Sequence, residues 1–169
     1  NSQPMGFYAP AQIVRDAREH GVEVRPVDVN ASFWDNVMEP DDQGGLALRF
    51  GVRQVKAISE EEASWLTAAR GNGYRSVEDV WRRAGTSPKL LRALAEADAF
   101  ASLRIGRRDA LWAAKALVPG EELPLFKGDL DGVGIFEPVV TLPEMTLGEE
   151  VVEDYVAMRL TLRAHPLAL

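Results

Sequence analysis

The chain has 169 residues, of which 46% are hydrophobic and 27% charged, enough apolar sequence for one ordinary domain or two small ones. It has no cysteine and two histidines, which excludes a disulfide scaffold, a cysteine nucleophile and a zinc site of thiolates or several histidines. The formal charge of −7 argues by itself against nucleic-acid binding, and no apolar run approaches the roughly 20 residues that span a membrane. The chain opens on Asn1 and not on Met, so we expect it to be a segment of a longer protein.

The charge is distributed unevenly between two breaks rich in Gly, Pro and acids, at 40–45 and 119–124. Residues 1–45 carry 3 basic and 8 acidic side chains, residues 46–118 carry 13 and 8, and residues 119–169 carry 3 and 10. A basic middle segment therefore lies between two acidic flanks. Such an asymmetry indicates that the middle segment faces an anion.

The first segment is predicted to be a short α/β piece. Pro10 suits the first position of a helix, which we expect over 11–20 with Gly21 as its stop. Apolar and polar residues then alternate over 22–29, which predicts a short strand, and an irregular stretch follows. This piece is too small to be a domain alone.

The middle segment is predicted to be nearly all helix, which makes the fold class mainly α. Ser59 and Glu62 form a capping box, and Ser87-Pro88 is a cap followed by a proline at the first helical position. In the last segment, Thr146 and Glu149 form another capping box. The expected elements are a strand leading into a helix at 46–55, helices at 60–70, 77–84, 89–97 and 107–118, an extended stretch at 137–143, and a helix at 147–160.

Residues 55–59, followed by a helix with Ala63 at its fourth position, have the layout of a helix-hairpin-helix. In that motif, main-chain N–H groups at a helix N-terminus hold one DNA phosphate without reading bases. Two positions of the turn that are usually glycine carry other residues here, and the alternative is an ordinary helical turn capped by Ser59. The residues expected to contact DNA at this hairpin are Arg49, Arg53, Lys56, Ala57 and Ser59.

A second helix–turn–helix unit covers 90–99 and 104–115, with Arg104, Arg107 and Arg108 near its turn. A basic cluster at a helix start can grip phosphates, and it opposes the helix dipole unless an anion is bound. The alternative is a solvated charged face. Asp129 and Asp131 lie in a Gly-rich loop without a nearby base or nucleophile, so we interpret them as turn residues. The sequence offers no catalytic constellation and no metal site.

A short apolar peptide, ELPLF, lies at 122–126 between glycines and acids. Such a segment can dock into a hydrophobic groove on a partner protein. The alternative is a linker that tucks Leu125 and Phe126 into its own domain.

Several strings resemble the bacterial C-family DNA polymerases. The wording of RPVDVN, RSVEDVWRRAG and TLGEEVVEDY is closer to their error-prone, damage-inducible branch than to the replicative polymerase III alpha subunit. QPMGFY and VRDAREHGVEVRPVDVN resemble the end of the fingers region, and LPEMTLGEEVVEDY and LRAHPLAL resemble the connector to an OB domain. The strings similar to a tandem helix-hairpin-helix are LRFGVRQVKAIS, RSVEDVWRRAG, LAEADAF and GRRDALWAAKAL.

The resemblance implies three parts: the end of the fingers at 1–45, a tandem helix-hairpin-helix at 46–118, and an acidic connector at 119–169. It implies a cytoplasmic parent polymerase that acts in translesion synthesis and induced mutagenesis, with its PHP domain and the Mg²⁺-binding palm N-terminal to this chain. The segment itself is then non-catalytic and without a cofactor. Asp98 occupies a position that is often Gly in the family, where an acid would repel a phosphate.

The resemblance also implies partners. The middle segment is expected to bind double-stranded primer–template DNA. ELPLF is similar to the sliding-clamp-binding peptide of the replicative relatives, and accessory mutagenesis proteins are further expected partners. The residues that match the clamp-binding peptide are Glu122, Leu123, Leu125 and Phe126.

Overall fold

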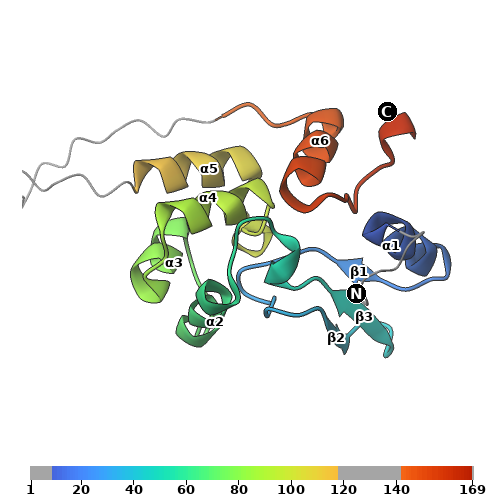
Figure 1. Ribbon diagram of the computed structural model, residues 1–169, viewed down its shortest axis with the longest axis horizontal. Coiled ribbons are helices and arrows are strands. Elements are labelled where there is room, and N and C mark those ends of the chain that lie inside the picture. The colour runs from blue at the N-terminus through green and yellow to red at the C-terminus, as the bar shows by residue number, and fades with distance from the viewer. Residues whose placement is uncertain (1–8, 118–141, 169) are drawn as a thin grey trace, which may run out of the picture.

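The computed structural model describes residues 9–117 and 142–168. Four short helices make up one half of the molecule, and α4 and α5 lie side by side and antiparallel (Figure 1). Serines 59, 76 and 87 each accept a hydrogen bond from an amide three residues on, which fixes where three of these helices begin. The four helices are α2 (Glu60–Ala69), α3 (Val77–Ala84), α4 (Pro88–Glu96) and α5 (Arg107–Ala116).

The other half contains a three-stranded sheet and the first helix, α1 (Pro10–Glu19). In the sheet, β3 (Leu46–Arg49) lies between β1 (Val24–Arg25), to which it is parallel, and β2 (Val37–Pro40), to which it is antiparallel. The Asp41 carboxylate accepts hydrogen bonds from the amides of residues 43 and 45 and closes the β2–β3 turn. The Gly/Pro/acid-rich break at 40–45 is therefore a hairpin turn inside the sheet.

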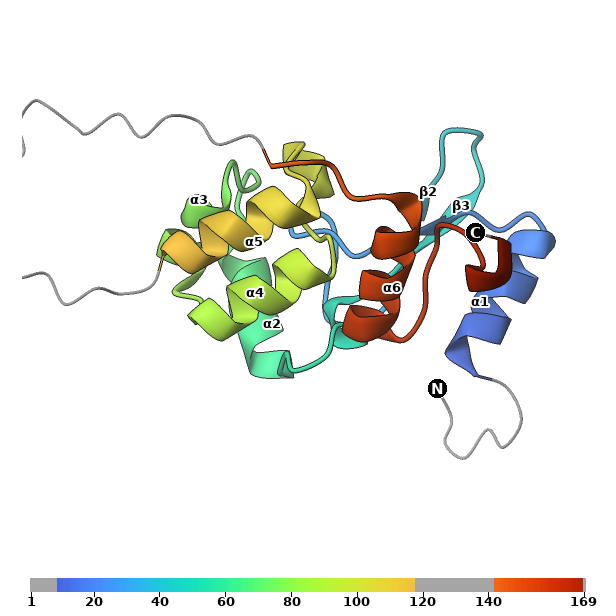
Figure 2. The same ribbon diagram turned by 90° about the horizontal axis from the view of Figure 1, so that it is seen from above.

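The last described segment joins the two halves. Figure 2 shows α6 (Leu147–Met158) between the α4–α5 pair and α1. Short 3₁₀ turns complete the described structure: η1 (Val52–Gln54), η2 (Ala101–Leu103) and η4 (Pro166–Ala168). No helix in residues 9–117 and 142–168 is both long enough and apolar enough to cross a membrane.

One hydrophobic core runs through all three segments of the chain. It combines Val27 and Val29 from the first segment, Leu94 and Phe100 from the middle, and Met158 from the last. The boundaries expected at 45 and 118 thus divide the chain by charge and not by hydrophobic core, and as functional boundaries they stay a prediction.

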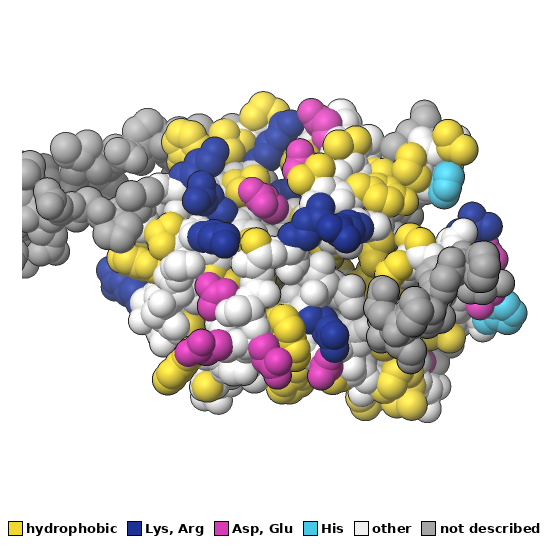
Figure 3. All heavy atoms as spheres, viewed as in Figure 1, with side chains coloured by type: hydrophobic (Ala, Val, Ile, Leu, Met, Phe, Trp, Pro, Cys, Tyr) yellow, Lys and Arg dark blue, Asp and Glu magenta, His cyan; other side chains and the backbone are white. Residues whose placement is uncertain are grey.

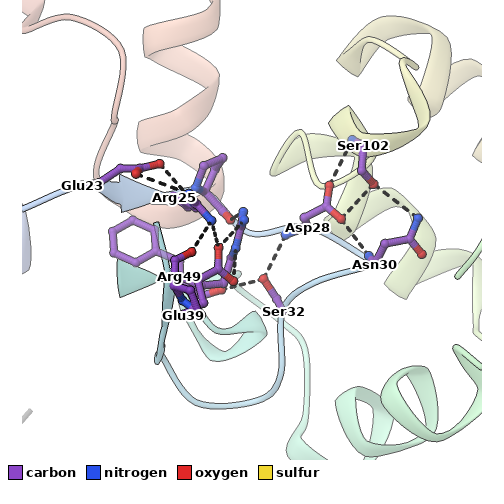
Figure 4. A network of polar contacts seen from close by, with 11 residues as sticks. Glu23, Arg25, Asp28, Asn30, Ser32, Glu39, Arg49 and Ser102 are labelled. Carbon is purple, nitrogen blue, oxygen red and sulfur yellow. Dashed lines mark hydrogen bonds and ion pairs between the residues drawn. The ribbon is translucent and has the colours of Figure 1, made fainter. Parts of the chain in front are cut away.

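The first segment also fixes the turn that follows α4 (Figure 4). The Asp28 carboxylate accepts hydrogen bonds from the Ser102 amide at 3.0 Å, the Ser102 hydroxyl at 2.8 Å and the Asn30 amide at 2.8 Å. The amide of Val29 donates to the carbonyl of Ala99 at 2.9 Å. Residues 28–30 therefore form part of the structural support of the second hairpin.

The prediction of a mainly α fold is confirmed, and the capped helices lie within two residues of their expected ends. Two expectations were wrong. The strand expected over 22–29 covers only Val24–Arg25, because the chain then turns toward the helices through Pro26. The stretch expected to be irregular after it contains β2. Most of the extended stretch expected at 137–143 lies outside the described residues.

Candidate nucleic-acid interface

The first hairpin has a left-handed residue in its turn, although the turn contains no glycine. Ala57 has φ of 63°, the left-handed conformation that favours glycine, whereas Ser59 has φ of −89° and needs none. Val55 and Ile58 are buried and anchor the turn to the core. The turn therefore places one alanine in a strained, left-handed conformation.

The N-terminus of α2, which follows this hairpin, is already satisfied by acids of the chain itself. The Glu62 carboxylate accepts the Ser59 amide at 3.0 Å, and the Ser59 hydroxyl accepts the Glu62 amide at 3.2 Å. This hydrogen bond from the Ser59 main chain lowers the pKa of Glu62 and keeps it charged. Glu60 and Glu61 share the first turn, so three carboxylates lie where a phosphate would bind.

The turn of the first hairpin contacts α6. The Lys56 amide donates to the carbonyl of Ala157 at 3.1 Å, and the Lys56 ammonium donates to the carbonyl of Val156. A lysine at a helix C-terminus matches the negative end of the helix dipole. The hairpin thus holds the end of α6 through Lys56, one of the residues expected to contact DNA.

The second hairpin begins where α4 ends. Asp98 has φ of 54°, and the amides of Asp98 and Ala99 donate to the carbonyls of Ala95 and Leu94, both at 3.0 Å. This is the Schellman pattern, in which the residue at the position of Asp98 is usually glycine. Asp98 is half-buried, and its carboxylate pairs with Arg163 at 2.7 Å.

The helix that leaves the second hairpin begins without a side-chain cap. Gly106 is the N-cap of α5, and no side chain of the described residues accepts its first amides. By contrast, α2, α3, α4 and α6 are each capped by a serine or threonine hydroxyl. An uncapped N-terminus offers main-chain donors and the positive end of the helix dipole to an anion.

Basic side chains lie beside this open helix end. A pocket here is lined by Arg104, Gly106 and Arg108, together with Asp109 and Glu144. Arg104 is exposed, and no carboxylate in the described part of the chain pairs with it. Arg108 pairs with Glu149 at 3.1 Å on the surface and donates to the carbonyl of Pro143 at 2.8 Å. An exposed ion pair contributes only about 0–1 kcal/mol, so a phosphate can compete with Glu149 for this guanidinium.

The expectation that Arg107 contacts DNA is corrected by its burial. Its side chain is 0% exposed, and its guanidinium pairs with Asp154 and lies 3.3 Å from Glu150, both on α6. A buried guanidinium needs such partners because an unpaired charge in a protein interior is strongly destabilising. The Arg107 side chain therefore joins α5 to α6 and offers no guanidinium atom to a phosphate.

Arg49 and Arg53 also have partners within the chain. Arg49 is 14% exposed and pairs with Glu39 across the β2–β3 ladder at 2.7 Å (Figure 4). Its hydrogen bond, and that of Arg25, lower the pKa of the Glu39 carboxyl. Arg53 pairs with Asp35 and lies over the ring of Trp34, 5.9 Å from its centroid. Both arginines stabilise the sheet end of the molecule.

Three basic residues that sequence reasoning did not select lie on α4 and α5. Lys89 and Arg92 on α4 and Lys115 on α5 are exposed, and Lys and Arg side chains gather over these helices in Figure 3. The signal was available, because Lys89 and Arg92 are three residues apart on a helix whose opposite face is Leu90, Leu91 and Leu94.

Two further points concern the clamp-binding peptide and a metal site. The clamp-binding peptide at 122–126 lies outside the described residues. Among the residues that are described, no group of three or more His, Asp or Glu side chains is arranged to hold a metal ion.

The chain has close relatives among known proteins. Residues 21–110 match the helix-hairpin-helix motif family. The whole chain is 64% identical to the error-prone DNA polymerase of Ruegeria pomeroyi. Over 99% of its length it is 52% identical to the error-prone DNA polymerase of Brucella abortus and 55% identical to error-prone DNA polymerase 2 of Rhizobium meliloti. The chain spans 15–16% of the length of these relatives.

Proposed function

The chain belongs to the helix-hairpin-helix family, and we propose that it is the sequence-independent, duplex-binding part of an error-prone DNA polymerase. The observation that carries the proposal is the uncapped N-terminus of α5 beside the exposed Arg104. Main-chain amides recognise any phosphate regardless of the base it carries, so binding through them is independent of sequence.

In this proposal the two hairpins have different roles. The second hairpin holds a phosphate of primer–template DNA at the start of α5, and Arg108 and the exposed lysines of α4 and α5 add attraction. The first hairpin contributes structure, because Glu62 fills the start of α2 and Lys56 holds α6. At the α5 pocket, the carboxylates of Asp109 and Glu144 offset the positive charge of Arg104 and Arg108. The main-chain donors at the start of α5 are therefore the principal contact in this proposal.

For the full-length protein, we extend the proposal to DNA polymerase activity in translesion synthesis and induced mutagenesis in the cytoplasm. Mg²⁺ supplies charge stabilisation in phosphoryl transfer between nucleotides. The described residues do not fit such a metal, as they contain no cluster of ligands, and no catalytic step is assigned to them. Their part is to bind and orient the duplex.

The second proposal concerns ELPLF at 122–126, which would bind a sliding clamp or an accessory mutagenesis protein. It rests on the sequence alone. The double substitution of Leu125 and Phe126 to Ala is expected to abolish clamp capture in a pull-down with the full chain. Equal capture by the variant and the wild type would exclude this peptide.

Anisotropy of a labelled primer–template duplex, titrated over a salt series, tests the leading proposal. Three or four phosphates neutralised by Lys or Arg side chains predict a slope of log affinity against log salt of about −3, since each neutralised phosphate contributes about −0.9. Arg104→Ala should reduce the slope by about one. Arg15→Ala, which removes a charge from the exposed Arg15–Glu19 pair on α1, is the matched control and should change neither slope nor affinity. Affinity that is independent of salt would contradict the proposal.

A further inference from the structure

A charge cluster behind the second hairpin connects it to the end of the chain. Arg163 follows α6 and lies outside the stretch that matches the helix-hairpin-helix family, yet its guanidinium pairs with Asp98 at 2.7 Å and with Glu150 at 2.8 Å. The same guanidinium lies 3.8 Å from Asp154. One arginine therefore faces three carboxylates near the start of α5.

The acid at the turn is the unusual member of this cluster. Asp98 occupies a left-handed position where glycine is favoured, at the turn that leads to the open start of α5. Burial raises the pKa of Asp98, while Arg163 opposes the shift and favours the charged form. An unneutralised carboxylate there would repel a phosphate held by the same hairpin.

We propose that Arg163 is a positioning residue for DNA: it neutralises Asp98 and so permits the second hairpin to accept a phosphate. This inference rests on the proposed duplex binding by that hairpin. The cluster of Asp98, Glu150, Asp154, Arg107 and Arg163 carries three negative and two positive charges. Without Arg163 its net charge changes from −1 to −2, next to the start of α5.

The expected effect is electrostatic and moderate. A unit charge about 10 Å from a phosphate, at an effective dielectric constant between about 20 and 80, changes affinity roughly two- to fifteenfold. Arg163→Ala should therefore weaken duplex binding by about fivefold. Arg163→Lys keeps the charge and should retain most of the affinity.

A double-mutant cycle on the full chain tests this, with duplex anisotropy at a fixed low salt concentration as the readout. Asp98→Asn removes the carboxylate charge in a residue that tolerates the left-handed conformation. In the Arg163→Ala background it should restore affinity to within about twofold of the wild type. Arg159→Ala, which removes an exposed charge from the same segment, is the matched control and should leave affinity unchanged.

The outcomes separate the inference from the proposed function. Equal affinity of Arg163→Ala and Arg159→Ala, or a loss that Asp98→Asn does not restore, would overturn the role of Arg163 while duplex binding by the wild type stands. A wild type that does not bind duplex overturns both. If Arg163→Ala does not fold, as shown by its circular dichroism, Arg163→Gln takes its place in the cycle: weaker duplex binding that Asp98→Asn restores supports the inference, and unchanged affinity or a loss that is not restored overturns it.

Discussion

The salt bridge between Arg107 and Asp154 gives the sharpest stability prediction. Asp154 lies on the buried face of α6 and is 4% exposed, and Arg107 at the start of α5 is 0% exposed. The Asp154 carboxylate also accepts the Thr161 hydroxyl at 2.7 Å. Asp154→Ala would leave the buried guanidinium with Glu150 as its remaining charged partner, at 3.3 Å.

The magnitude follows from what remains buried. Removal of one partner from a buried ion pair costs about 3–5 kcal/mol, and the remaining Glu150 places this case near the lower end, at about 3 kcal/mol. For a chain of this size, a loss of about 3 kcal/mol lowers the melting temperature by roughly 6–12 °C. Replacing both partners with apolar residues, as Arg107→Met with Asp154→Leu, should cost less than about 1 kcal/mol.

Thermal unfolding followed by circular dichroism at pH 7 measures these differences. Glu78→Ala breaks the exposed Arg82–Glu78 pair on α3 and is the matched control, with an expected loss below about 0.5 kcal/mol. A loss below about 1 kcal/mol for Asp154→Ala, or a double variant as unstable as the single one, would refute the assignment of a buried, partner-dependent charge.

Three further predictions concern the scaffold. Gly51→Ala should destabilise the fold by at least about 3 kcal/mol in urea unfolding, because the Cβ of the new alanine would lie 2.2 Å from the Trp34 carbonyl oxygen. A loss below about 1 kcal/mol would contradict this contact. Arg83→Ala should cost about 2 kcal/mol in the same assay, since its guanidinium donates to three carbonyls at the end of α2 and just beyond it, and unchanged stability would exclude that role. Glu62→Gln should lower the melting temperature at pH 7. The difference in melting temperature should disappear as the pH falls below 4.5, because a carboxyl group with a lowered pKa stabilises the fold only while it is charged in the folded state. A difference that grows in acid would contradict the capping box.

Local signals predicted the helices well, because the starts of α2, α3, α4 and α6 are each encoded within four residues. Ser59 with Glu62 and Thr146 with Glu149 form the capping boxes that their spacing indicates. The strand β2 was missed because its four residues neither alternate clearly nor carry β-branched residues beyond Val37. Its place in the sheet depends on pairing with β3, which a local pattern does not contain.

The candidate site was less predictable because it depends on distant partners. Arg107 and Arg108 are neighbours with the same charge, yet one is buried against Asp154 and the other is on the surface. A sign of this existed in the last helix, where Asp154 falls between Val151 and Met158 in the apolar stripe. An acid within such a stripe indicates a buried cation, although it does not say which.

The central claim is that duplex DNA binds at the open start of α5, and Gly106→Asp tests it most directly. The backbone at Gly106, with φ of −69°, accepts a side chain, and a Cβ there would meet its nearest atom, a carboxylate oxygen of Asp109, at 3.9 Å, which partly offsets the stability gained from a cap. The new carboxylate would cap α5 and fill the phosphate position. We predict an unchanged or slightly higher melting temperature with about a tenfold weaker affinity for duplex DNA and a shallower salt slope. Unchanged affinity and slope in a folded Gly106→Asp variant would contradict the claim.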